Sequence, residues 1–227
     1  MSENTNEKAV ETKTTESKTA KKRMDKEAIK KMTTLALLVA IIVVLQAIAP
    51  MIKLPVNISF ALIPITVGAI LLGPAGGAIL GATFGIMTII NALIGADLFT
   101  KGLMSVSFSA ALFTVLLCLV KATAAGFLAG VVYKLLRNKT LIGATFVAAA
   151  TAPIVNTGIF ILGGLTVLSD AIVKAGFLGA SGQSMAHFLI IGCAGINFIA
   201  EFGVNMLFAT AIKTIVDAVQ KATSKKV

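Results

Sequence analysis

From Met32 onward the sequence is a succession of long apolar segments, and no other feature constrains the fold as much. A helix needs about 20 apolar residues to cross a hydrocarbon core about 30 Å thick. Charged residues, glycines and prolines divide the chain into segments of about this size. We therefore predict six membrane-spanning helices, at residues 32–49, 59–72, 75–94, 104–136, 141–165 and 188–216.

The distribution of charge agrees with this prediction. Only 13% of the residues are charged, about half of what a soluble domain carries. Residues 1–31 alone hold nine of the twenty basic and six of the ten acidic residues. We expect an all-α, polytopic membrane protein with three parts: a polar, disordered tail at 1–31, a six-helix domain at 32–221 and a short basic tail at 222–227.

The basic residues also predict the orientation in the membrane. With six spans, both termini lie on the same side as the second and fourth loops. The opposite side receives only Lys53, Lys101 and Lys174, and all other Lys and Arg residues between 21 and 226, apart from Lys121 within a span, fall on the first side. Because cytoplasmic loops are enriched in Lys and Arg, we expect both termini to be cytoplasmic.

Several function classes are not expected from the sequence. The net charge of +10 comes from residues that flank spans, so we expect no nucleic-acid partner. The one histidine is His187, and Cys118 and Cys193 lie in apolar runs, so we expect no metal site. We find no phosphate-binding loop and no catalytic constellation, and we expect no cofactor and no enzyme activity. The polar segment at residues 1–31 is too long for the start of a cleaved signal peptide.

Proline and glycine interrupt the most apolar region. Gly73 and Pro74 predict a tight cytoplasmic turn between the second and third spans, because proline can begin a helix but not continue one. We expect Pro64 to interrupt the second span and to free a backbone carbonyl, which is tolerable only beside protein or a wet cavity. A short, interrupted span is typical of transporters, although a kink that only aids packing remains an alternative.

Small residues four apart recur in three of the predicted spans. Such a pattern places them on one helix face and lets a neighbouring backbone approach closely. The patterns are Ala36 and Ala40 in the first span, Gly77, Gly81 and Gly85 in the third, and Gly126 and Gly130 in the fourth.

Polar side chains within the spans are costly in lipid and are therefore informative. In the predicted orientation most of the amides gather in the extracellular half, as expected of a pocket that collects a small polar solute. The candidate binding residues are Gln46, Asn57, Asn91, Asn156, Asn197, Glu201 and Lys121. The alternative is that these side chains only cross-link helices.

Two ionisable residues, Lys121 and Glu201, lie deep within predicted membrane spans. They pair with each other, or Lys121 meets an anionic solute; we favour a structural role for Lys121. The predicted outer loop at 163–187 is too long for a simple connector and is a candidate lid. The outer loop at 95–103 is a candidate second flap.

Several motifs together resemble the substrate-binding S components of energy-coupling factor (ECF) transporters. The resemblance covers residues 32 to about 221. It rests on ALLVA at 36–40, which matches the family's AxxxA motif, and on IPITVGAILLGPAGGA at 63–78 followed by GATFG at 81–85. TAPIVN at 151–156 and NFIAE at 197–201 look similar too.

The resemblance implies a vitamin-binding subunit in a bacterial plasma membrane. Such a subunit docks on a transmembrane coupling protein driven by two ATPases, and the AxxxA surface, here Ala36 and Ala40, meets the coupling protein. Toppling of the whole subunit would carry the outer pocket inward. The chain has no Trp and one Tyr, which disfavours a thiamin-type site. We rank pantothenate first, then riboflavin or folate.

Two alternatives belong to other classes. A self-sufficient secondary transporter would usually show paired inverted repeats with intramembrane acids, and we find no convincing repeat. A non-transporting membrane assembly protein would need no outer pocket.

Overall fold

The computed structural model describes residues 3–51, 60–179 and 183–224, and all regular secondary structure in these ranges is helical. Contacts divide the chain into two units, Met1–Leu37 and Leu38–Val227. Helix α1 (Glu3–Ile48) starts within the segment predicted to be a disordered tail, so the structure describes that segment as helix. The domain boundaries near residues 31 and 221 stay predictions.

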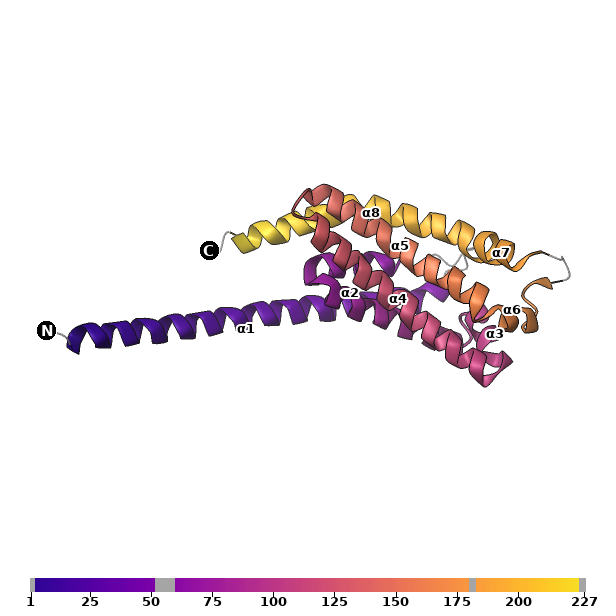
Figure 1. Ribbon diagram of the computed structural model, residues 1–227, viewed down its shortest axis with the longest axis horizontal. Helices are drawn as coiled ribbons and strands as arrows, with labels where there is room; N and C mark the ends of the chain where they lie inside the picture. Colours follow the sequence, from indigo (N-terminus) through magenta and orange to yellow (C-terminus); the bar gives the residue numbers. More distant parts are fainter. Residues whose placement is uncertain (1–2, 52–59, 180–182, 225–227) are drawn as a thin grey trace. The chain divides into compact units, whose positions relative to one another are not determined.

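Five described helices are long and apolar enough to cross a membrane (Figure 1). They are Lys26–Ile48 within α1, α2 (Leu62–Leu93), α4 (Phe108–Leu136), α5 (Leu141–Thr166) and the stretch Met185–Ala211. That last stretch contains α7 (Met185–His187), a π-helical segment (Phe188–Gly195) and most of α8 (Ile196–Ser224). The chain is therefore an all-α, multi-pass membrane protein, as predicted.

Helix α2 divides at Gly73. This glycine has φ 82° and ψ −174°, a conformation that residues with a Cβ rarely adopt. Pro74 then begins the second half, where its missing N–H removes no hydrogen bond from the first half. The predicted turn between the second and third spans is confirmed. Counting the two halves of α2 separately agrees with six spans, although the count and the side of the termini stay predictions.

Pro64 does not interrupt a span. Helix α2 begins at Leu62, so Pro64 lies in its first turn, where backbone N–H groups have no intrahelical partner. The carbonyl that we expected Pro64 to free belongs to Phe60, and it accepts a hydrogen bond from Ile63 N at 3.2 Å. The prediction of an interrupting proline is wrong, because Phe60 and Ala61 form a turn and the helix begins at Leu62.

The predicted fourth span is also wrong at its start. Helix α3 (Leu98–Val106) ends before Ser107, which is extended at φ −165° and ψ 164°. The Ser107 hydroxyl accepts a hydrogen bond from Ala110 N at 3.2 Å and caps α4. Residues 104–136 therefore form parts of two helices. The candidate flap at 95–103 is largely helix α3, with the Asp97 carboxylate capping it through Thr100 N at 3.0 Å.

The helices of the second unit form a closed bundle. Helix α2 packs on α4, α4 on α5, α5 on α8, and α8 returns to α2. The contact between α2 and α4 is the most extensive, and glycines make it close. A Cβ at Gly81 would meet the carbonyl oxygen of Ala122, and a Cβ at Gly85 would lie 2.7 Å from that of Cys118. The predicted close approach along the third-span glycines is confirmed.

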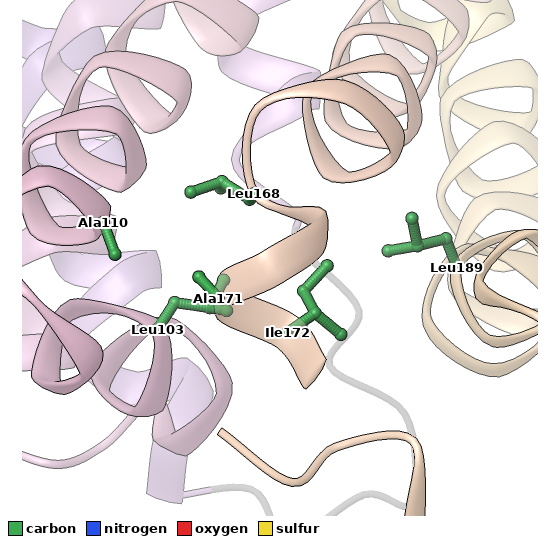
Figure 2. Close-up of a cluster of buried hydrophobic side chains, with 6 residues drawn as sticks. All are labelled: Leu103, Ala110, Leu168, Ala171, Ile172 and Leu189. Carbon is green, nitrogen blue, oxygen red and sulfur yellow. The ribbon is translucent and has the colours of Figure 1, made fainter. Parts of the chain in front are cut away.

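A buried apolar cluster joins the two candidate flaps at one end of the bundle. We call Leu103, Ala110, Leu168, Ala171, Ile172 and Leu189 the cap cluster. Figure 2 shows these side chains coming from α3, α4, the segment around α6 (Ser169–Lys174) and the π-helical segment. Because the two flaps share this core, we expect any lid movement to involve both together. That they act as a lid stays a prediction.

Candidate functional site: polar side chains within the bundle

A ladder of polar residues runs along α8. Asn197, Glu201 and Asn205 are spaced four apart, which places them on one helix face. Asn197 Nδ2 donates to Glu201 Oε1 at 3.3 Å, and Asn205 Nδ2 donates to the Glu201 carbonyl at 3.0 Å. The Thr66 hydroxyl of α2 lies 3.5 Å from Asn205 Oδ1. The structure thus brings Asn197 and Glu201 together, and Asn205 links the ladder to α2.

Asn156 lies on α5, the neighbour of α8, and is 7% exposed. Its Oδ1 and that of Asn197 are buried and accept no hydrogen bond from the described residues. Both residues lie inward from the end of the bundle at which Leu189 packs against Gly164. A buried acceptor without a donor costs about 1–3 kcal/mol. The two oxygens therefore favour a solute that carries hydrogen-bond donors.

Gln46 and Asn91 are both buried, and the side chain of Asn91 binds the backbone of Gln46. Asn91 Nδ2 donates to the backbone carbonyl of Gln46 at 3.1 Å, which ties the end of α2 to α1. The Asn91 carbonyl accepts from the backbone N–H groups of Ala96 and Asp97. This pair matches the cross-linking alternative. Asn57 lies outside the described residues.

Replacement of Asn91 by leucine is expected to lower the free energy of unfolding by about 1–3 kcal/mol, because the Gln46 carbonyl would remain buried without its donor. Thermal unfolding of the purified protein measures this change. Asn138→Leu is the control, since Asn138 is exposed beyond the end of α4. Equal melting temperatures for the two variants would contradict the structural role of Asn91.

Lys121 is half-buried in α4, and its Nζ lies 5.2 Å from the centroid of the Phe160 ring on α5. No carboxylate within the described ranges pairs with it. The pairing of Lys121 with Glu201, which the sequence left open, is therefore not the arrangement of the structure. A cation over an aromatic face is a favourable contact, but a weaker one than an ion pair in the same place.

The sequence analysis missed a group of four aromatic rings beside the cap cluster. The Phe99 ring lies 6.0 Å from Phe160, 4.8 Å from Phe177 and 6.2 Å from Phe188, measured between centroids. These residues come from α3, α5, the segment after α6 and the π-helical segment. No periodic pattern connects them in the sequence, so only the fold brings the rings together.

One hollow of the described structure is apolar and lies on α4 and the end of α5. Phe113, Leu117, Val120, Gly163 and Val167 are among its lining residues, and none of the predicted polar residues lines it. An outer polar pocket is therefore still a prediction. Within the described residues, no group of three or more His, Cys, Asp or Glu side chains is placed to hold a metal ion.

The AxxxA residues lie on an exposed face of α1. Leu38, Ile42 and Gln46, spaced four apart, are the buried positions of the helix. Ala36 and Ala40 are exposed, and Ala40 is two residues from both Leu38 and Ile42, about 160° around the helix from each of them. Within the unit Leu38–Val227, Ala40 is thus not covered by the described residues.

These features define a multi-pass, all-helical membrane protein with polar groups buried within its bundle. The family model for the substrate-specific component of ECF transporters matches residues 30–216. This match spans most of the 227 residues, and the chain belongs to that family. A comparison with curated proteins found no match.

Family membership defines the class of activity. S components are the substrate-binding subunits of transporters and not enzymes, and they associate with an ECF module that contains a transmembrane protein and ATPases.

Proposed function

We propose that this S component captures a water-soluble vitamin from outside a bacterial plasma membrane, with both of its own termini in the cytoplasm. The transmembrane coupling protein and two ATPase subunits then drive uptake. The observation that carries the proposal is the pair of buried acceptor oxygens, Asn156 Oδ1 and Asn197 Oδ1, on neighbouring helices. Hydroxyl or amide hydrogens of a vitamin would satisfy both.

The energetics favour a ligand over a purely structural role for these two amides. A polar group within a membrane bundle is costly unless it is hydrogen-bonded. Asn91 and Asn205 satisfy this condition through partners in the chain. Asn156 and Asn197 each keep an acceptor unused within the described residues, which suits a site that is completed by its solute.

Among vitamins, we propose pantothenate first and riboflavin or folate next. Pantothenate carries hydroxyl and amide hydrogens that match amide acceptors. The chain has no Trp, and its one Tyr, Tyr133, lies near the end of α4 away from the cap cluster. This arrangement disfavours a site that sandwiches a thiamin ring between such residues.

The test is binding of pantothenate, riboflavin, folate and thiamin to the purified full-length chain, measured by calorimetry and by the shift in melting temperature. We expect one of the first three to bind. Asn156→Leu should weaken that binding by about tenfold, the value of one hydrogen bond, without lowering the melting temperature of the unliganded protein. Failure of every vitamin to bind the folded chain would contradict the proposal.

Thr151→Val provides the matched control on α5. The Thr151 hydroxyl already donates to the Val147 carbonyl at 2.7 Å, so its removal should leave vitamin binding unchanged. Vitamin accumulation in liposomes by the chain alone, without coupling protein or ATPases, would instead indicate a self-sufficient transporter.

A further inference from the structure

Lys121 carries a positive charge at a depth where charges are expensive. It is the fourteenth residue of α4 (Phe108–Leu136), about 20 Å along the helix from its start at 1.5 Å per residue. Lysine within a membrane span is rare and almost always pairs with an acid or lines a wet cavity. Lys121 has the Phe160 ring as its partner in the described structure.

Asp97, Asp170 and Glu201, the acidic side chains described in the second unit, form no ion pair with Lys121 in the described structure. The Asp97 carboxylate caps α3 through Thr100. Glu201 Oε1 accepts from Asn197, and Asp170 is exposed on α6. A neutralising anion for Lys121 is therefore not supplied by these side chains.

Through Phe160, Lys121 is near both Asn156 and the group of four aromatic rings. Phe160, which lies under the ammonium group, is four residues from Asn156 and shares its face of α5. Phe160 also packs edge-on against Phe99. Leu117, one turn from Lys121 on α4, packs against the cap cluster. Lys121 thus contacts a ring that lies one helical turn from Asn156, whose Oδ1 accepts no hydrogen bond from the described residues.

We propose that the solute site selects a carboxylate-bearing ligand, with the Lys121 ammonium as its counter-charge, the Asn156 acceptor as its hydrogen-bond partner and the Phe160 ring as its apolar wall. This inference rests on the proposed function and narrows it. It places the anions pantothenate and folate ahead of riboflavin, which is neutral at pH 7.

The experiment compares pantothenate with pantothenol, its neutral alcohol analogue, on the purified full-length chain; folate with riboflavin is the second pair. We expect wild-type protein to prefer the anion of a pair by at least about tenfold, as for other buried charge pairs. Lys121→Met should abolish the preference, and Lys121→Arg should retain part of it. Lys174→Met is the control, because Lys174 is an exposed cation on α6.

Melting temperature separates this role from a structural one. An unpaired charge replaced by an apolar side chain of similar length should leave the unliganded protein equally or more stable. A lower melting temperature of Lys121→Met with unchanged anion preference would overturn the inference. Tight binding of riboflavin that Lys121→Met does not affect would also overturn it and leave the proposed function standing. No binding by the folded wild-type chain would contradict both.

Discussion

Replacement of Gly81 by leucine is expected to prevent accumulation of folded protein, and Gly81→Ala to lower the free energy of unfolding by about 2 kcal/mol. A Cβ at Gly81 would collide with the backbone carbonyl of Ala122 on α4. Overpacking costs about 1–3 kcal/mol and more where backbone must move. The higher helix propensity of alanine offsets about 1 kcal/mol of this destabilisation. The collision is the larger effect, so the net change is destabilising.

Gly158→Ala is the matched control. Gly158 lies within α5, and a Cβ there would meet no atom within 4 Å. This variant should gain helix propensity without overpacking and should be as stable as the wild type or more stable. Thermal unfolding of both alanine variants in one detergent measures the difference. A melting temperature of Gly81→Ala at or above that of Gly158→Ala would contradict the close α2–α4 packing.

Ala40→Trp and Ala36→Trp are each expected to reduce vitamin uptake in cells by at least about tenfold, while vitamin binding to the isolated chain stays unchanged. Both alanines are exposed on α1, and Ala40 lies opposite the buried positions Leu38 and Ile42. A partner helix that packs closely against small residues cannot accommodate an indole ring. Uptake assays and co-purification with the coupling protein measure the effect.

Ile41→Trp is the control for this interface. Ile41 is adjacent to Ala40, 39% exposed, and about 100° around the helix from it. It lies at the same depth, so the tryptophan perturbs the lipid contact similarly but faces a different neighbour. Normal uptake by Ala40→Trp, or equal loss of uptake by Ile41→Trp, would contradict an interface centred on the alanines.

Features that depend on one segment of chain were predictable. Hydropathy defined the membrane class, because the cost of exposing backbone and charge to lipid acts on each segment separately. The break at Gly73 followed from the Gly-Pro pair alone. The small residues of the third span indicated close packing, and the structure supplied the partner, α4. Membership of the S-component family agreed with motifs that are each a short, continuous segment of the sequence.

Errors arose where a local signal depends on a helix end. Pro64 interrupts a helix only if the helix begins well before it, and α2 begins at Leu62. Likewise, the apolar run through 104–136 conceals the cap at Ser107, since a serine changes hydropathy little but can end one helix and begin the next. Element boundaries depend on such caps more than on hydropathy.

The sequence by itself determined that amide side chains such as Asn91 and Asn156 stand within apolar segments. Only the tertiary structure decided which polar side chains are buried and which of these already have hydrogen-bond partners. Asn91 and Asn156 look alike in the sequence, yet Asn91 donates to the Gln46 carbonyl and Asn156 keeps an unused acceptor. Thr66 and Asn205 meet across 139 residues of chain. Hydrogen-bond partners come from segments distant in sequence, so their geometry exists only once the helices have packed.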